Sequence, residues 1–307
     1  MRETYGVVLP GMNLTDLTGR LIVIEGTDGV GRTTQINLLK PWLEQQGRAV
    51  LVTGMTRSSL AGKGIKQAKE GHTLGRVTLS LFYSTDFADR LENEIVPALR
   101  AGFVVLTDRY TYSLMARALV RGIDPAWIRN AYSFALKPDV VFYLRIGVDD
   151  LIPRVVFSRG FDYWESGMDL HPSEDMYESF RKYQTDLLKQ FDVLAEEYRF
   201  EVIDASTDVR AIFDLLRDGV SRVLTAEPLF AASKPQAAEE AAPETAPQLA
   251  EASPAASSAS EAPPQAPETP AAPQPTPRAA EAHRASAAEE KPGAKVLVNA
   301  AEGEPST

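Results

Sequence analysis

The sequence of 307 residues contains no cysteine. Disulfide bonds, thiolate nucleophiles and cysteine-ligated metals are therefore excluded, and the absence fits a reducing compartment. No stretch of about 18 consecutive apolar residues occurs, so we expect no membrane-spanning helix and no membrane partner. The first residues lead into no long apolar run. A secretory signal peptide is accordingly not expected, and the sequence predicts a cytoplasmic protein.

Aromatic residues are missing from the last part of the chain, where none follows Phe230. From about residue 231 onward Ala, Pro, Glu, Ser and Gln predominate, and such a segment cannot bury enough apolar surface to offset the entropy of ordering it. We therefore expect a disordered tail over 227–307, acting as an interaction arm, a solubiliser or a plain spacer. Before it, the composition indicates an N-terminal extension over 1–18 and one globular domain over 19–226.

Positive charge is scarce, and the net charge is −10. Residues 231–307 hold eleven acidic and five basic side chains, a balance of −6, which leaves −4 for the remainder. Neither part has the basic excess typical of a nucleic-acid-binding protein. We expect no nucleic-acid partner.

Short apolar runs alternate with longer helical patterns through the globular part. The runs at 21–25, 49–53, 103–107, 140–146 and 200–203 are rich in Val, Ile and Leu without polar alternation, which indicates strands buried on both faces. Helical spacing is found over 32–46, within 65–99 with a break near 71–74, and over 113–120, 125–136, 149–157, 174–198 and 209–224. This alternation predicts a three-layer α/β fold with a five-stranded parallel sheet, in which ligands bind beyond the carboxyl ends of the strands.

A glycine-rich stretch, GTDGVGRTT over 26–34, lies between the first predicted strand and the first helix. It matches the phosphate-binding pattern GxxxxGK[ST] at every position except Arg32. The glycines permit close approach of the main chain to a polyphosphate, and the amides at the start of the helix favour an anion. Thr33 is positioned to offer its hydroxyl to Mg²⁺. An ordinary glycine-rich turn is the alternative.

Arg32 replaces the lysine of the pattern. Arginine is larger than lysine, planar and always protonated, and it can bind phosphate in a bidentate manner. Its reach and angle differ from those of lysine, so alignment in the transition state could suffer. Two hypotheses stay open: a functional arginine, or altered nucleotide use.

A second polar cluster, Thr107-Asp108-Arg109-Tyr110, ends the third predicted strand. An acid here can hold the magnesium shell, and the adjacent arginine can bind a second phosphate. Separating two anionic reactants is the main task in phosphoryl transfer, so cations are expected where donor and acceptor meet. A strand-end salt bridge is the alternative interpretation. The phosphate loop on the first strand favours the functional one.

Four segments now make a resemblance visible. They are EGTDGVGRTTQ over 25–35, DRYTYSLMA over 108–116, PDVVFYL over 138–144 and VIDA over 202–205. In this order they resemble the motifs of the thymidylate kinase family, nucleoside-monophosphate kinases of the P-loop fold. The resemblance covers about residues 20–224.

The resemblance implies ATP-dependent, Mg²⁺-requiring phosphorylation of a deoxynucleoside monophosphate by a homodimer. It implies that Asp108 serves the metal with Thr33, that Arg109 binds the acceptor phosphate, and that Ser113 lies near the acceptor nucleoside. Asp28 is expected to approach the acceptor sugar and phosphates. The residues expected at the ATP phosphates are Gly26, Thr27, Asp28, Gly29, Val30, Gly31, Arg32, Thr33, Thr34, Arg154 and Arg159.

Arg154 and Arg159 belong to a lid candidate. They flank the end of the helix predicted over 149–157, and Arg159 opens a segment that runs to Leu170. In the family such arginines close on the ATP phosphates, and closure would exclude water as a competing acceptor. Surface arginines on a helix are the alternative interpretation. Arg32, Asp108, Arg109 and Arg159 are the predicted catalytic residues.

The acceptor pocket departs from the family pattern. Where the family has a TREPGG-like segment, this chain has TGMTRSS over 53–59, and Arg57 is the candidate for gripping the acceptor phosphate. Phe82 is available for stacking on the base, but Asp86 or Phe87 falls where an arginine is expected, and Arg90 follows one helical turn later. Because an aspartate accepts hydrogen bonds where an arginine donates them, the base need not be thymine. The Tyr-Gln that usually follows the second motif is Arg117-Ala118 here.

The sequence therefore predicts a kinase that converts a nucleoside monophosphate to the diphosphate, with dTMP as the leading acceptor. The acceptor phosphate oxygen is already anionic, so positioning and charge cancellation, not a strong general base, should provide the catalysis. A kinase for another or modified monophosphate stays possible. So does a nucleotide-binding regulatory protein with weakened transfer, which Arg32 and the altered acceptor segment motivate.

Overall fold

The structure is a computed structural model that describes residues 2–70 and 74–225. The tail expected over 227–307 lies outside the described residues. The strands are β1 (Arg20–Gly26), β2 (Val50–Gly54), β3 (Val104–Asp108), β4 (Val140–Arg145) and β5 (Glu201–Asp204). The helices are α1 (Arg32–Gln45), α2 (Gly62–Glu70), α3 (Arg76–Arg90), η1 (Leu91–Ile95), α4 (Val96–Arg100), α5 (Thr111–Val120), α6 (Pro125–Ala131), α7 (Val148–Ser158), α8 (Met176–Tyr198) and α9 (Val209–Thr225).

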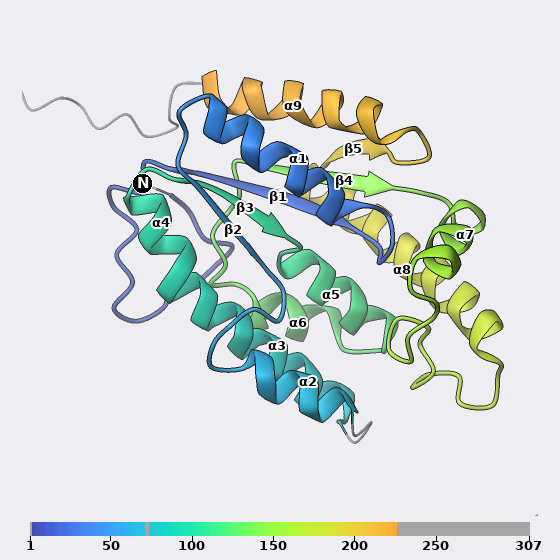
Figure 1. The fold of residues 1–307 in the computed structure, drawn as a ribbon. Helices are drawn as coiled ribbons and strands as arrows, with labels where there is room; N and C mark the ends of the chain where they lie inside the picture. Colours follow the sequence, from blue (N-terminus) through green and yellow to red (C-terminus); the bar gives the residue numbers. More distant parts are fainter. Residues whose placement is uncertain (1, 71–73, 226–307) are drawn as a thin grey trace, which may run out of the picture. The chain divides into compact units, whose positions relative to one another are not determined.

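The five strands form one parallel sheet in the order β2-β3-β1-β4-β5 (Figure 1). The central strand β1 pairs with β3 on one side and β4 on the other. Its residue Ile24 lies beside Asp108, and Gly54 of β2 lies on the other side of Asp108. The predicted α/β fold with a five-stranded parallel sheet is confirmed. Its register brings the phosphate loop and the second polar cluster to neighbouring strand ends.

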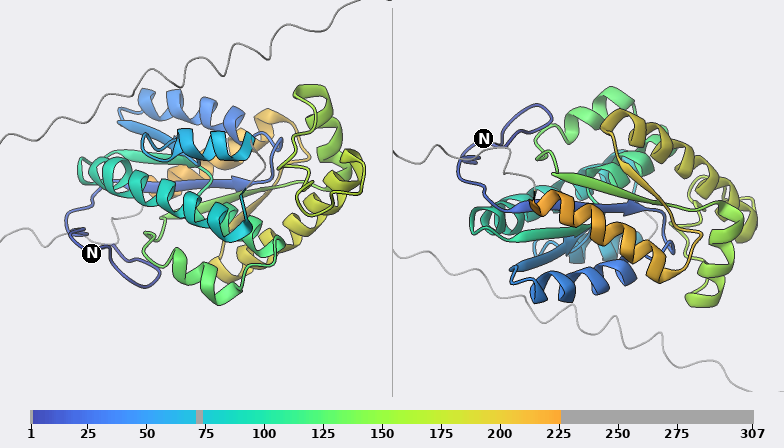
Figure 2. Two further views of the ribbon diagram at one scale, coloured as in Figure 1. Left: turned by 90° about the horizontal axis from the view of Figure 1, so that it is seen from below. Right: turned by 90° about the horizontal axis from the view of Figure 1, so that it is seen from above.

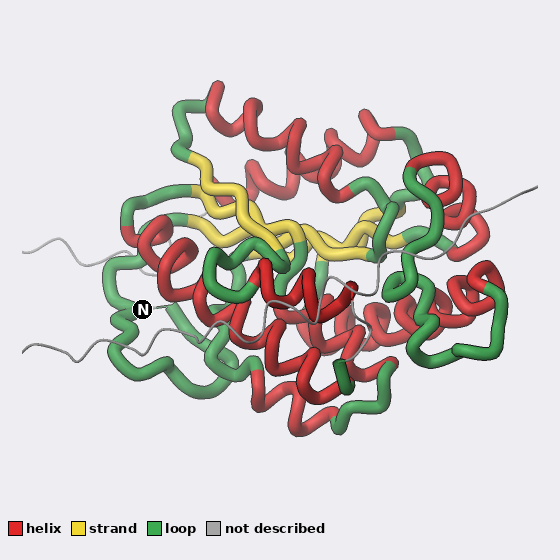
Figure 3. The backbone as a smooth tube through the Cα atoms, turned by 60° about the horizontal axis from the view of Figure 1, so that its bottom comes forward, coloured by secondary structure: helices red, strands yellow, loops and turns green. Residues whose placement is uncertain are grey.

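Helices cover both faces of the sheet, as the tube drawing shows (Figure 3). Alternate strand residues face opposite layers. Ile22, Ile24 and Phe142 pack with α1, α7 and α9, while Leu21, Val23 and Tyr143 pack with α3, α5 and α8. The continuous apolar runs of the strands are explained by these two cores, one on each face.

The helical stretch that precedes β3 agrees with the spacing predicted within 65–99 after a break near 71–74. α3, η1 and α4 follow one another without interruption from Arg76 to Arg100, and η1 is a π-helical turn. α6 is shorter than the helix predicted over 125–136, because residues beyond Ala131 bond elsewhere. Leu136 forms an antiparallel bridge with Thr4, and the Ala135 carbonyl accepts from the Tyr5 amide.

The N-terminal segment lies at the end of the sheet opposite α7 (Figure 2). It packs against the domain: Arg2 is buried, bonds to the Gly19 carbonyl and pairs with Asp139 at 2.6 Å. Leu14 and Leu17 are also buried. No helix within the described residues combines the length and apolar character needed to cross a bilayer.

Candidate active site

The phosphate loop joins β1 to α1 through residues in the left-handed region. Gly29 has φ +85°, and a Cβ there would lie 2.6 Å from a methyl carbon of Val155. Gly31, the N-cap of α1, has φ +107° with open space around it. Among the described residues no side chain caps this helix end. Its first amides are therefore available to an anion, which the helix dipole favours.

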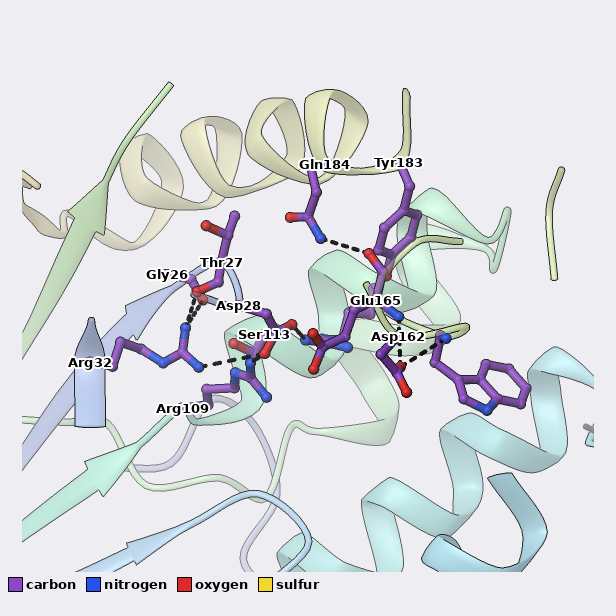
Figure 4. A network of polar contacts seen from close by, with 12 residues as sticks. Gly26, Thr27, Asp28, Arg32, Arg109, Ser113, Asp162, Glu165, Tyr183 and Gln184 are labelled. Carbon is purple, nitrogen blue, oxygen red and sulfur yellow. Dashed lines mark hydrogen bonds and ion pairs between the residues drawn. The ribbon is translucent and has the colours of Figure 1, made fainter. Parts of the chain in front are cut away.

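Arg32 is buried beneath this loop, with 7% of its surface exposed. Its Nε donates to Asp108 Oδ1 at 2.7 Å, and its Nη1 donates to the carbonyls of Gly26 at 2.6 Å and of Thr27. Figure 4 shows the guanidinium turned toward these carbonyls. The side chain thus links the phosphate loop to the end of β3, with its charge held at the loop.

Thr33, in the first turn of α1, and Asp108, the last residue of β3, face each other. The Thr33 hydroxyl donates to Asp108 Oδ2 at 3.1 Å. A hydroxyl and a carboxylate are oxygen ligands of the kind that Mg²⁺ takes, and Mg²⁺ is commonly held by one or two such groups together with substrate phosphates. The two predicted metal ligands are brought together and fit the ion.

Asp28, inside the phosphate loop, is surrounded by guanidinium groups. Arg109 and Arg117 pair with its carboxylate, while Arg32 Nη2 lies 3.8 Å and Arg159 Nη2 4.0 Å from Oδ1. Figure 4 shows Asp28 between Arg32 and Arg109. The Asp28 side chain is only 5% exposed. One buried carboxylate therefore organises positive charge from four different segments of the chain.

Arg109 adopts φ +70°, a left-handed conformation that is uncommon outside glycine. Its amide donates to the Ile24 carbonyl at 3.0 Å, and its carbonyl accepts from the Thr107 hydroxyl at 2.7 Å. Burial, followed by repulsion from Arg117, lowers the pKa of Arg109 to about 9. The group is still cationic at neutral pH, and an added anion would relieve the repulsion.

Ser113 does not point freely into a cavity. Its hydroxyl donates to Glu25 Oε2 at 2.5 Å, and Glu25 Oε1 accepts from the amides of Tyr110 and Ser113. Glu25 is fully buried, and burial raises its pKa. This carboxylate fixes the first turn of α5 against β1. Glu25 had no assigned role from its place in the sequence, and the acceptor role of Ser113 stays a prediction.

The segment that follows β2 is held by Asp86. Its two oxygens accept from the amides of Thr56 and Ser58, both at 3.0 Å, and Oδ2 also accepts from Arg90 Nε at 3.0 Å. Asp86 has no exposed surface. These contacts show a residue that shapes the loop carrying Arg57. They give its predicted base contact no support, and that contact stays a prediction.

Arg57 belongs to this loop, and Phe82 lies on α3. Arg57 is exposed, and its guanidinium lies beside Gly54, the last residue of β2. A Cβ placed on Gly54 would be 3.4 Å from Arg57 Nε and 3.2 Å from Asp108 Cβ. Arg57 is therefore close to the strand end where the two predicted metal ligands meet. Phe82 is half-buried, with its ring edge toward Gly64 of α2. Its stacking on a base stays a prediction.

The lid candidate is tied to its surroundings by several contacts. Arg159 pairs with Glu165 at 2.5 Å, and Arg154 donates weakly to the carbonyls of Val30 and Ser206 at 3.5 and 3.4 Å. Arg121, directly after α5, binds both oxygens of Asp169 at 2.8 and 3.0 Å. Arg159 thus lies near Asp28, and Arg154 of α7 lies next to the phosphate loop.

A cavity of about 560 Å³ opens between α2 and the segment that holds Asp162 and Trp164. This volume is typical of small-molecule sites. The lining residues are Thr56, Gly62, Ile65, Lys66, Lys69, Glu70, Asp162 and Trp164. Burial, then repulsion from Arg117, lowers the pKa of Lys69.

Comparison with known proteins gives one consistent family. The profile described as thymidylate kinase matches residues 24–215. The chain belongs to the thymidylate kinase family.

Relatives from archaea and bacteria agree with this assignment. A probable thymidylate kinase 2 of Saccharolobus solfataricus is 38% identical over 64% of this chain and 92% of the relative. A probable thymidylate kinase of Thermococcus kodakarensis is 32% identical over 62% and 92%. A thymidylate kinase of Bifidobacterium longum subsp. infantis is 34% identical over 68% and 92%.

Membership of the thymidylate kinase family confirms the resemblance drawn from the four motifs, and with it the nucleoside-monophosphate kinase class. The structure brings Arg32, Thr33, Asp108, Arg109 and Asp28 together as the sequence predicts. It also adds Arg117, a buried partner of Asp28 to which no role had been assigned. The signal was present, since Arg117 follows Ser113 by one helical turn.

Proposed function

We propose that this protein transfers the γ-phosphoryl group of ATP to the phosphate of dTMP, giving ADP and dTDP. One observation supports the proposal above the others. β1 and β3 are neighbours, so the phosphate loop and Arg109 meet at the carboxyl ends of these two strands. Asp28 of the loop pairs there with Arg109. This is the arrangement that a donor phosphate and an acceptor phosphate require for in-line transfer.

In this proposal the ATP phosphates lie on the amides of residues 26–34. Arg32 stabilises the charge that develops during transfer, and Arg154 and Arg159 approach from the lid side. Preorganised cations in a site shielded from water supply much of the rate enhancement in such reactions. The acceptor oxygen attacks with its own negative charge, so correct placement replaces a strong base.

We further propose that Thr33 and Asp108 hold Mg²⁺. When bound, this ion neutralises charge on the β- and γ-phosphates. Arg32 already donates to one oxygen of Asp108, and Thr33 donates to the other. The two side chains therefore keep the carboxylate oriented toward the phosphate loop.

The acceptor is proposed to lie between Arg109 and the loop carrying Arg57, with its base toward the 560 Å³ cavity. Arg57 and Arg109 would hold its phosphate, Asp28 its sugar side, and Phe82 its base. On family grounds we also propose a homodimer located in the cytoplasm. Size-exclusion chromatography with light scattering on the full chain tests the dimer.

A panel of nucleoside monophosphates, each with ATP and Mg²⁺, tests the function. Formation of dTDP and ADP from dTMP is expected. Faster turnover of another monophosphate would replace dTMP as the acceptor. Tight ATP binding without transfer to any member of the panel would overturn the proposal in favour of a regulatory nucleotide-binding protein.

A further inference from the structure

Two residues on one face of α5 contact the end of β1 and the phosphate loop that follows it. Ser113 and Arg117 are four positions apart, so their side chains lie one above the other on the helix. Ser113 binds Glu25, and Arg117 Nη2 donates to Asp28 Oδ2. Arg117 is buried, with 7% of its surface exposed. Its guanidinium therefore faces the loop where the phosphates are proposed to bind.

Asp28 pairs directly with two buried guanidinium groups. Arg109 takes Oδ1 and Arg117 takes Oδ2, and these two side chains are only 12% and 9% exposed. Nearby carboxylates are already engaged: Glu165 pairs with Arg159, and Glu25 accepts from α5. Burying a guanidinium group is costly unless its charge and its N–H groups are met by partners. The pair of arginines thus shares a single negative charge and has capacity for a second anion.

An acceptor phosphate supplies a second anion. A phosphate monoester carries nearly two negative charges at neutral pH and accepts bidentate bonds from guanidinium groups. Arg117 lines a small recess that shares Trp164 with the cavity proposed for the acceptor, whereas Arg32 lies toward Thr33 and Asp108. Arg117 is therefore on the acceptor side of Asp28.

We propose that Arg117 is a second ligand of the acceptor phosphate. Arg109 and Arg117 grip the phosphate of the nucleoside monophosphate together, and Asp28 keeps both guanidiniums in position before the acceptor binds. This inference rests on the proposed function and deepens it. It also accounts for an arginine at a position where the family usually has tyrosine.

The test distinguishes binding of the acceptor phosphate from binding of its nucleoside part. In the full-length protein, Arg117→Met removes the charge and keeps much of the side-chain volume. Dissociation constants for dTMP, for thymidine and for ATP are measured by calorimetry, with competition against dTMP for weak ligands. We expect dTMP affinity to fall on the order of 10- to 100-fold, as for a lost hydrogen bond to a charged group. Thymidine and ATP affinities should stay within about twofold, a change below ~0.5 kcal/mol.

Two further variants control for folding. Arg117→Lys keeps the charge without the planar fork, and an intermediate loss for dTMP alone is expected. Arg121→Met changes a buried arginine that follows the last residue of α5 and binds Asp169 and Tyr183 instead of the loop. It should lower the melting temperature without a selective loss for dTMP over thymidine.

Other outcomes would overturn the inference. Equal losses for dTMP and thymidine in both Arg117 variants would show a structural role, and a loss for ATP alone would place Arg117 on the donor side. Unchanged dTMP affinity would show no role in binding. Failure of the proposed function is distinguishable, because the unmodified protein would then form no dTDP. If the panel selects another monophosphate, that nucleotide and its nucleoside replace dTMP and thymidine.

Discussion

Arg32 donates its Nε–H to Asp108 Oδ1 at 2.7 Å, a contact between residues 76 positions apart in the sequence. The bond joins the cation of the phosphate loop to the carboxylate proposed to hold the metal. Arg32 thereby keeps its own guanidinium and the Asp108 side chain in one fixed relation. An arginine in place of lysine consequently acts on two parts of the site at once.

Removing the charge of Arg32 should therefore impair transfer more than binding. We expect Arg32→Met to lower kcat by about 100-fold or more, because a preorganised cation at the developing charge is lost. Arg32→Lys should stay within about tenfold of the original, because charge is retained while the bond to Asp108 is weakened. Steady-state kinetics on both variants provide the measurement.

Lys40→Met is the matched control for Arg32. Lys40 lies on the same helix, is half exposed and lies 3.6 Å from Glu44. Its replacement should leave kcat unchanged. Full kcat in Arg32→Met would contradict the assigned role, and a faster Arg32→Lys variant would show that arginine is the poorer cation at this position.

The Mg²⁺ concentration needed for transfer should depend on the Thr33 hydroxyl. We expect chelation of divalent ions to abolish transfer, and Thr33→Val to raise the half-saturating Mg²⁺ concentration on the order of tenfold through the loss of one oxygen ligand. Titration of velocity and of nucleotide binding with Mg²⁺ measures both effects. Thr85→Val, which changes an exposed hydroxyl bonded within α3, should have no effect. An unaltered Mg²⁺ titration in Thr33→Val would remove Thr33 from the metal site.

Asp86 should be a structural residue. Asp86→Ala leaves Arg90 buried without its partner and frees the amides of Thr56 and Ser58. Breaking one side of a buried ion pair costs about 3–5 kcal/mol. We expect a loss of this order in the free energy of unfolding, measured by urea denaturation.

The double variant Asp86→Met with Arg90→Met tests the same interpretation. Because no charge is left buried without a partner, it should be less destabilised than Asp86→Ala. If Asp86→Ala instead kept its stability and changed the preferred base, the base-reading hypothesis would be correct.

Arg159 should act on the transferred phosphoryl group. It is half exposed, pairs with Glu165 and lies 4.0 Å from Asp28. Arg159→Met is expected to reduce kcat on the order of 10- to 100-fold with a smaller change in ATP affinity. Arg181→Met is the control, since Arg181 is equally exposed and lies 3.9 Å from Asp149. Equal kcat in the two variants would exclude Arg159 from catalysis.

Much of the fold was predictable because its signals are local. Buried parallel strands leave continuous apolar runs, and each of the five predicted runs overlaps an observed strand. The phosphate loop was recognisable because its glycines and threonine occur in one short segment. The end of α6 was not predictable, since it depends on pairing between Leu136 and the distant Thr4.

Within the site, the residues that were missed act across long separations. Arg117 and Asp28 are 89 positions apart, and Ser113 and Glu25 are 88 apart. A charged residue on a helix usually indicates a solvated face, yet Asp86 is fully buried because it bonds to main-chain amides of a separate loop. Contacts of this kind cannot be predicted from sequence spacing, because they form only when the sheet brings distant loops together.

The central claim is that the cations gathered at the phosphate loop transfer a phosphoryl group from ATP to dTMP. Incubation of the full chain with ATP, Mg²⁺ and dTMP, followed by chromatographic separation of the nucleotides, tests it most directly. The account predicts equal amounts of ADP and dTDP. ATP binding with no diphosphate formed from dTMP or from any other nucleoside monophosphate would contradict it.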